Sequence, residues 1–290
     1  MIPELIVNGA ATGGVFALLA VGFSLIFGVA RIINLSHTAF GMLAAYLLYA
    51  LVTSYGLNFY LSVLLSILLT VLIGTLLYRL CLHPVREHEL TVLVISVALG
   101  VLIQQVMVQL FGGTFRSLPS FAAGYLEVFG VRVLKGHLLV LGIALLSLLA
   151  LWLLLTRTKL GIAIRATAQD REMANLVGIN VGWICTLTMA LALALAALSG
   201  TLIGPLITLS PWTWLQLLVV VLAVVVLGGL GSLKGSLIAA FLLGYTETAV
   251  VFFVPMGSFL RGVASLTVML IVLVLRPEGL FGISFEEERL

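Results

Sequence analysis

Apolar runs long enough, or nearly long enough, to cross a lipid bilayer dominate the sequence. A helix needs about 20 mainly apolar residues to span the roughly 30 Å hydrocarbon layer, where its backbone polar groups must be satisfied internally. We predict nine spans: Leu5–Gly28, Thr38–Ser54, Phe59–Leu80, Thr91–Phe111, His137–Thr156, Ile184–Gly204, Trp214–Leu230, Leu237–Val254 and Gly262–Leu275. With 62% hydrophobic and 9% charged residues, the chain does not fit a soluble domain. The predicted fold is all-α: one polytopic transmembrane helical bundle over residues 1–290, with about eight to ten spans.

Basic residues are distributed unevenly between the two sets of connections that alternate along this topology. One set holds Arg31, Arg79, Arg86, Lys234, Arg276 and the basic residues of 157–181. The other set holds fewer: Arg116, Arg132, Lys135 and Arg261. Since basic residues are enriched in cytoplasmic loops, the first set is expected to be cytoplasmic, with the N-terminus outside and the C-terminus inside.

The segment Arg157–Val181 is too polar to lie in lipid and too regularly patterned for a loose linker. Six charged residues, Arg157, Lys159, Arg165, Asp170, Arg171 and Glu172, alternate with apolar residues in its first part. From Thr167 the apolar residues fall three and four apart, which predicts a short amphipathic helix that Gly178 ends. Two interpretations are equally open: a helix that docks onto another protein, or a solvated loop on the lipid headgroups.

Two breaks, rich in glycine or polar residues, interrupt the apolar pattern and predict interrupted helices near 31–37 and 227–236. The first is RIINLSH and the second is LGGLGSLKGS, and a similar small-and-apolar run follows each of them. This similarity hints at an internal repeat, as in many transporters. A break at membrane depth must face protein or a water-filled cavity, because lipid cannot satisfy its backbone.

Several residues in or beside the spans are candidates for lining a translocation path: Asn34, Ser36, His37, Gln105, Gln109, Gly229, Gly231 and Glu247. The first three lie in an irregular segment whose dipoles could meet a zwitterionic or polar solute. The two glutamines share a helix face and either line a polar path or hold helices together. Glu247 is a functional candidate because carboxylates inside a membrane are costly; burial at a helix contact with Thr246, Thr248 or Arg261 is the commoner case.

The sequence contains none of the familiar catalytic, metal-binding or nucleotide-binding patterns, including the Walker A motif. We therefore expect no enzymatic activity, no cofactor and no bound metal. If transport is active, its energy comes from a partner or from an ion gradient. The first case predicts a subunit driven through the charged segment. The alternative is a stand-alone secondary carrier or channel that uses Glu247 and the glutamines.

Four stretches, in order, resemble permease subunits of branched-chain amino acid ABC transporters. They are GGVFALLAVGFSLIFGVARIINLSHTAFGML at Gly13–Leu43, LGIAIRATAQDREMANLVGINV at Leu160–Val181, VLGGLGSLKGSLIAAFLLGYTE at Val226–Glu247, and LVLRPEGLFG at Leu273–Gly282. The resemblance covers essentially the whole chain. It is to the Liv type, which also serves for urea and related amides, and within that type to the LivH-like subunit.

This resemblance implies a bacterial-type inner-membrane permease that forms the path for branched-chain or other small amino acids, urea or amides. Its implied partners are a second permease (identical or different), two cytoplasmic ATPase subunits, an extracytoplasmic solute-binding protein and membrane lipid, but no nucleic acid. The path would run between the two permeases. Within the coupling segment 157–181 a coupling helix would dock into the ATPase, with candidate residues Arg165, Asp170, Arg171, Glu172, Met173, Leu176, Val177 and Gly178.

Overall fold

The computed structural model is built almost entirely from helices, and it describes residues 2–119, 121–122, 124–128, 131–276 and 279–281. The helices are α1 (Ile2–Ala30), α2 (His37–Tyr49), α3 (Phe59–Leu77), α4 (Glu89–Phe111), α5 (Lys135–Arg157), α6 (Lys159–Gln169), α7 (Arg171–Leu176), α8 (Val181–Ile203), α9 (Thr213–Gly228), α10 (Leu233–Phe253) and α11 (Arg261–Leu275). Short π- or 3₁₀-helical turns, η1 (Ala50–Ser54), η2 (Tyr78–Leu82) and η3 (His83–Val85), extend α2 and α3, and η4 (Gly257–Leu260) precedes α11.

Each of the nine predicted spans falls on one of these helices. Seven helical segments of the described chain are long and apolar enough to cross a membrane, and α9 and α11 are apolar but shorter. The predicted polytopic helical bundle, with interruptions near 31–37 and 227–236, is therefore confirmed. One element was not expected: an antiparallel hairpin of β1 (Tyr125–Val128) and β2 (Val131–Leu134), in which Tyr125 pairs with Leu134.

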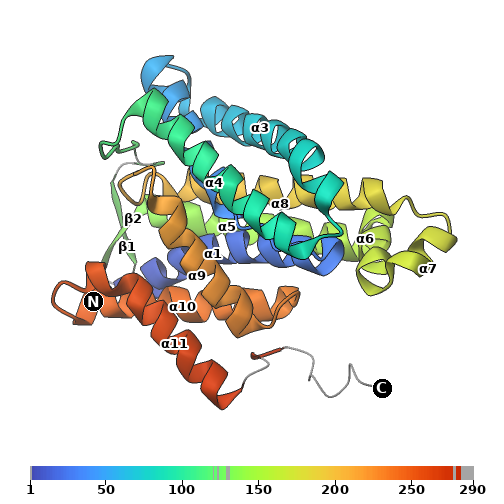
Figure 1. Ribbon diagram of the computed structural model, residues 1–290. Coiled ribbons are helices and arrows are strands. Elements are labelled where there is room, and N and C mark those ends of the chain that lie inside the picture. Colours follow the sequence, from blue (N-terminus) through green and yellow to red (C-terminus); the bar gives the residue numbers. More distant parts are fainter. Residues whose placement is uncertain (1, 120, 123, 129–130, 277–278, 282–290) are drawn as a thin grey trace.

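Helix α1 forms the centre of the bundle, where α10, α8 and α5 pack around it (Figure 1). It is apolar on all sides, as expected of a helix that other helices surround. Small residues let its neighbours approach closely: Gly13 of α1 lies against the backbone of Gly244 in α10. In the same way Gly41 of α2 meets Gly200 of α8.

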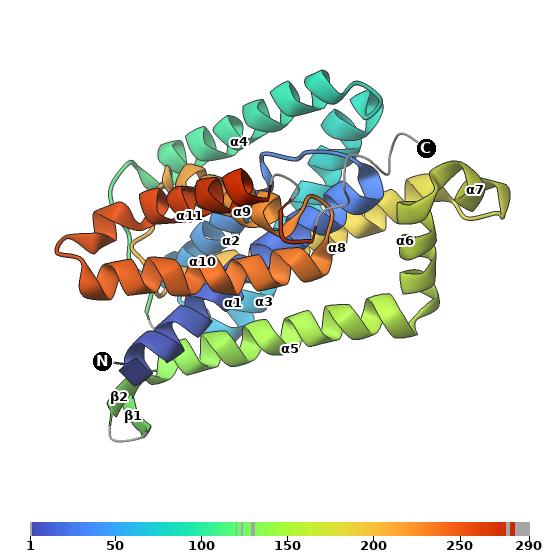
Figure 2. The ribbon, with the colours of Figure 1, turned by 90° about the horizontal axis from the view of Figure 1, so that it is seen from below.

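The bundle has two distinct ends, which we call the α6–α7 end and the hairpin end (Figures 1 and 2). The N-terminus lies at the hairpin end, and α11 runs toward the α6–α7 end. There the backbone of Leu280 and Phe281 donates to the carbonyls of Leu227 and Gly228 at the end of α9. The basic-rich connections therefore gather at the α6–α7 end, as the alternating topology requires.

The first break brings irregular backbone deep into the bundle. After α1 ends, residues 31–36 turn back along it, so α2 begins beside the middle of α1, where His37 Nε2 donates to the Leu19 carbonyl over 3.2 Å. The Leu35 N–H donates to Ser96 Oγ of α4 at 3.2 Å, and the Ser36 N–H donates to Asn34 Oδ1 at 3.1 Å. Protein groups thus satisfy this backbone at membrane depth.

The second break lies at a different level. Residues 229–232 form a turn near Gly28, at the α6–α7 end of α1, and Ser232 Oγ caps α10 by accepting from the Gly235 N–H at 3.1 Å. By contrast, α9 begins deep in the bundle, where Thr38 Oγ1 donates to the Trp214 carbonyl at 3.0 Å. The structural counterpart of the start of α2 is therefore the start of α9, and not the 227–236 break that the sequence similarity suggests.

Candidate functional site

The polar segment forms two short helices at one end of the bundle. Thr158 Oγ1 caps α6 by accepting from the Gly161 N–H at 3.0 Å, and Asp170 Oδ1 caps α7 by accepting from the Met173 N–H at 3.0 Å. Gly178, with a φ of +87°, ends the second helix. From the sequence we expect one helix starting near Thr167; the structure divides it at Asp170, because that side chain begins a new helix.

Helix α7 projects from the bundle (Figures 1 and 2). Its large apolar side chains are exposed. The exposed fractions are 61% for Met173, 79% for Leu176 and 75% for Val177, whereas Ala174 is buried. Arg165, Asp170, Glu172 and Gly178 are exposed as well. Seven of the eight candidate coupling residues are therefore exposed at this end of the bundle, and Arg171, which is partly buried, is the eighth.

Arg171 turns from α7 toward the bundle. Its guanidinium donates twice to the Val29 carbonyl, from Nε at 3.1 Å and from Nη2 at 2.8 Å. Val29 lies in the last turn of α1, whose carbonyls have no partner within the helix, and a cation is favourable at that end of a helix. The side chain thus links α7 to the point where the first break begins. No local pattern predicts this contact, since 142 residues separate the partners.

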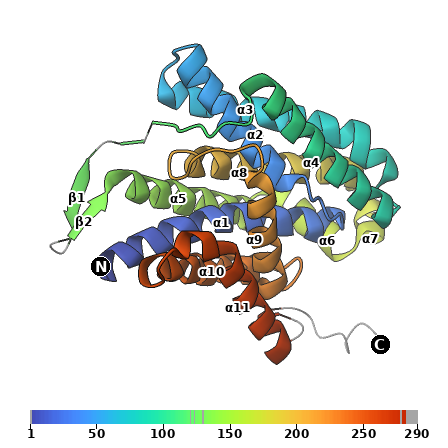
Figure 3. The same ribbon diagram turned by 60° about the vertical axis from the view of Figure 1, so that its left-hand side comes forward.

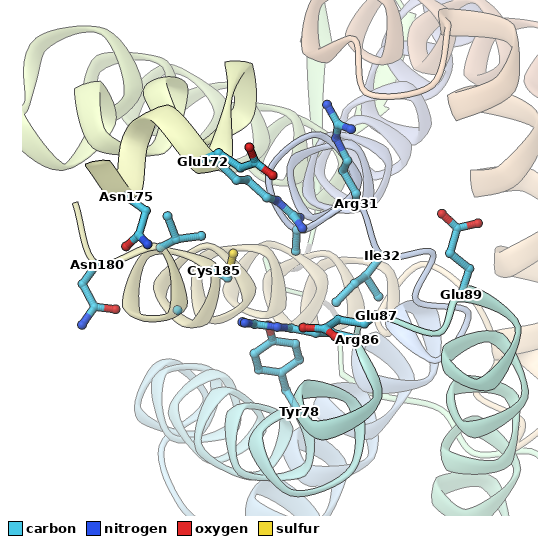
Figure 4. Close-up of a pocket in the computed structure, with 14 residues that line it drawn as sticks. Arg31, Ile32, Tyr78, Arg86, Glu87, Glu89, Glu172, Asn175, Asn180 and Cys185 are labelled. Atoms are coloured by element: carbon cyan, nitrogen blue, oxygen red, sulfur yellow. The ribbon is translucent and has the colours of Figure 1, made fainter. Parts of the chain in front are cut away.

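A cavity of about 560 Å³ opens beside this contact (Figure 4). It lies between the end of α1, helix α7 and the start of α8 on one side, and the η2–η3 turns and the start of α4 on the other. Charges of both signs line it, from Arg31, Arg86, Arg171, Glu87, Glu89 and Glu172. The cavity therefore lies between α7 and the start of α4.

Asn34, Ser36 and His37 come together where α2 begins, and all three are buried. Ser36 Oγ donates to Asn34 Oδ1 at 2.6 Å, and the ring of His37 stacks edge-on to Phe23. Within the described chain His37 Nδ1 has no hydrogen-bond partner. Hydrogen bonds of Asn34 and Ser36 therefore support the break, whereas one ring nitrogen of His37 is left unsatisfied.

The remaining path candidates do not join this cluster. Gln105 and Gln109 are exposed on α4, whereas neighbouring Gln104 is buried and accepts from Trp214 Nε1 at 2.7 Å. Glu247 of α10 is buried and accepts from Ser265 Oγ of α11 at 2.6 Å. Its partner is thus a serine that the sequence did not single out.

Gly229 and Gly231 have φ values of +95° and +82° in the turn between α9 and α10. Glycine is favoured there because other residues adopt this conformation only with strain. The two glycines form the turn that brings this connection against Gly28 of α1 and residues 279–281.

Comparison with known proteins identifies the family. The model of the branched-chain amino acid transport system permease component matches residues 5–275. The chain belongs to this permease family. It is 28% identical to the high-affinity branched-chain amino acid transport system permease protein BraD of Pseudomonas aeruginosa, covering 96% of this chain and 94% of the relative. It is 26% identical to the corresponding protein LivH of Escherichia coli, covering 95% and 94%.

The same resemblance extends to an archaeal relative and to a solved fold. The probable branched-chain amino acid transport permease protein LivH of Methanocaldococcus jannaschii is 27% identical and covers 98% of this chain. The structure of PsaBC from Streptococcus pneumoniae in complex with Fab has a TM-score of 0.54 at 17% identity, covering 96% of this chain and 97% of that one. The predicted LivH-like permease is thus confirmed, and the chain is a permease component, not an enzyme.

Proposed function

We propose that this permease is the membrane subunit of an ABC importer for branched-chain or other small amino acids, with urea or related amides as a second solute class. A second permease, two cytoplasmic ATPase subunits and an extracytoplasmic solute-binding protein complete the transporter. The relatives support the amino acid class through their names, and the fold supports a subunit without its own energy source. A stand-alone carrier is less favoured, because the family is one of components of a transport system.

One observation carries this proposal: the exposed apolar surface of α7 at the end of the bundle where basic residues gather. Met173, Leu176 and Val177 would insert into a groove of the ATPase, and Arg165, Asp170 and Glu172 would contact its rim. An aqueous surface that exposes three adjacent large apolar side chains is typical of a protein interface. The basic-rich connections favour a cytoplasmic α6–α7 end and C-terminus, in an inner membrane.

The solute path would run between the two permeases. Gln105 and Gln109 offer neutral donors and acceptors on its wall. The buried residues Asn34, Ser36 and His37 would not line this path, but would hold the start of α2 in position. Gly229, Gly231 and Glu247 would shape the connections that move when the path changes its open side.

The test replaces Met173, Leu176 and Val177 together by serine. All three side chains are largely exposed, so the fold should persist while the apolar docking surface is lost. We expect the purified permease to lose at least tenfold in affinity for its ATPase subunits, measured by co-purification and by titration in nanodiscs. Leu80→Ser is the matched control, because Leu80 is 64% exposed and belongs to η2 at the same end.

Unchanged ATPase affinity in the triple variant would contradict the proposed docking role. A permease that transports amino acids when reconstituted alone would contradict the importer itself. The two experiments are independent, because transport by the permease alone is measured without ATPase subunits.

A further inference from the structure

Three glutamine side chains are exposed on apolar helices of the bundle. Gln105 and Gln109 lie one turn apart on α4, and Gln216 lies in the first turns of α9. No hydrogen bond joins any of these amides to another residue of the described chain. Buried Gln104, which bonds Trp214, shows how an amide is satisfied within this bundle. Each exposed amide therefore keeps two N–H donors and a carbonyl acceptor for something outside the chain.

Gln105 and Gln216 lie at depths where lipid offers no hydrogen-bond partner, whereas Gln109 lies near the edge of the hydrocarbon. Helix α4 has 23 residues with Gly100 at its midpoint. At 1.5 Å per residue, Gln105 lies about 8 Å and Gln109 about 14 Å from that level, against a half-thickness of about 15 Å for the hydrocarbon. The bond between Thr38 and Trp214 places the start of α9, and with it Gln216, at the depth where α2 begins.

Other outward faces of the bundle have a different composition. Between Leu61 and Leu76 every exposed side chain of α3 is apolar. Its polar residues Ser62, Ser66 and Thr70 are buried and Thr75 is partly buried. The exposed side chains of α5 between Leu139 and Leu153 are also apolar. Figure 2 shows α5 on the opposite side of the bundle from α4. The α3 and α5 faces thus have the chemistry of a lipid contact.

We infer that Gln105, Gln109 and Gln216 mark the face that packs against a second permease subunit and borders the solute path between the two. We call it the amide face. An unpaired amide in hydrocarbon costs free energy, whereas glutamines hydrogen-bond readily across helices inside a membrane. The inference rests on the proposed function, which supplies the second permease and the path.

The surroundings of the amides fit this assignment. Exposed Val101, Leu102 and Val106 on α4, and Leu215 and Val219 on α9, provide apolar contact area beside them. Helix α4 packs mainly against α2 within the chain and leaves the rest of its circumference open. The start of α9 lies next to α4 (Figures 1 and 3), where Trp214 contacts Gly100 and bonds Gln104. Neutral amides also suit a zwitterionic solute, because they offer both a donor and an acceptor without holding either charge tightly.

The experiment places a benzophenone amino acid at one position of the co-expressed transporter in native membranes. The test positions are Gln105 and Gln216, and the matched controls are Leu72 of α3 and Leu146 of α5, each 67% exposed. After irradiation, mass spectrometry identifies each adduct. We expect peptides of a second permease subunit from both test positions and only lipid adducts from the two controls.

A second measurement addresses the path. In a background in which the free thiols Cys81 and Cys185 are replaced by serine, Gln105→Cys should react with a membrane-impermeant thiol reagent at least tenfold faster than Leu146→Cys. Lipid adducts alone at Gln105 and Gln216, or permease adducts of equal yield at Leu72 and Leu146, would overturn the inference. Co-purification of the ATPase subunits from the same membranes reports docking at α7 separately, so a failure of this inference is distinguishable from a failure of that docking.

Discussion

The contact between Arg171 and Val29 gives the sharpest prediction about energy coupling. Movement of α7 under a docked ATPase would act directly on the last turn of α1, because the guanidinium joins the two at 2.8 and 3.1 Å. Residues 31–36 follow that turn at once, and Arg31 already has an unusual φ of +46°. We therefore predict that Arg171→Ala separates ATP hydrolysis from the membrane part of the cycle.

The expected effect of Arg171→Ala follows from the hydrogen bonds between Arg171 and the Val29 carbonyl. Hydrogen bonds from a charged donor contribute about 1.5–3 kcal/mol when well buried. Arg171 is partly exposed, so solvent screening reduces this to about 1–2 kcal/mol. That corresponds to a change of roughly 5- to 30-fold in the equilibrium that the contact favours. Arg171→Lys keeps the charge but loses the two-donor geometry, and it should give an intermediate value.

The assay compares solute-stimulated with basal ATP hydrolysis, for the complete transporter in nanodiscs with its solute-binding protein. For Arg171→Ala we expect stimulation to fall at least fivefold while basal hydrolysis stays within twofold. The exposed cation Lys234 lies at the same end of the bundle, so Lys234→Gln is the matched control and should behave as the wild type. Full stimulation and transport in an intact Arg171→Ala complex, confirmed by size-exclusion chromatography, would refute the reasoning.

Three further substitutions test packing and buried polar contacts. Gly200→Ala places a Cβ against the α2 backbone and should destabilise the fold by about 1–3 kcal/mol. The measurement is the thermal unfolding midpoint, which should fall. The control Gly142→Ala, whose Cβ would meet open space, should leave that midpoint unchanged. Gln104→Leu removes the acceptor of the Trp214 indole N–H, and we expect about 1–3 kcal/mol of destabilisation with altered tryptophan fluorescence; unchanged stability would contradict it. Asn34→Ala removes the acceptor of two hydrogen bonds and should speed trypsin cleavage in residues 31–36; wild-type cleavage would count against that support role.

Much of the fold follows from local signals in the sequence. Apolar runs of sufficient length place the helices, and a positive φ at Gly178 ends α7 where a glycine follows an amphipathic pattern. The division at Asp170 also has a local signal, because aspartate is a preferred N-cap residue. The apolar spacing continues across that residue, however, and therefore favours a single unbroken helix. Exposed Met173, Leu176 and Val177 follow from the same pattern.

The depth of each break could not be predicted in this way. Depth depends on which distant groups satisfy the backbone, and the decisive contacts join Leu35 to Ser96 and Thr38 to Trp214. The start of α9 looks like an ordinary turn in sequence, whereas the glycine-rich 227–236 break resembles the first one more closely. Their similar composition suggests that the 31–37 and 227–236 breaks correspond, but the packing places them at different depths. The bond between Ser265 and Glu247 could not be predicted either, because Ser265 has no distinguishing neighbours in the sequence.

These distant contacts form one continuous set that runs from the proposed docking surface to the amide face. Arg171 of α7 holds the end of α1, the break that follows is tied to α4 through Ser96, and the start of α2 holds the start of α9 through Thr38. The backbone carbonyl of Trp214 accepts the bond from Thr38, and its indole N–H donates to Gln104 of α4. Gln104 is next to exposed Gln105. A shift of α7 that moves the end of α1 can therefore be passed along these hydrogen bonds toward the amide face. For that reason substitutions along the set should impair coupling even where they contact neither solute nor ATPase.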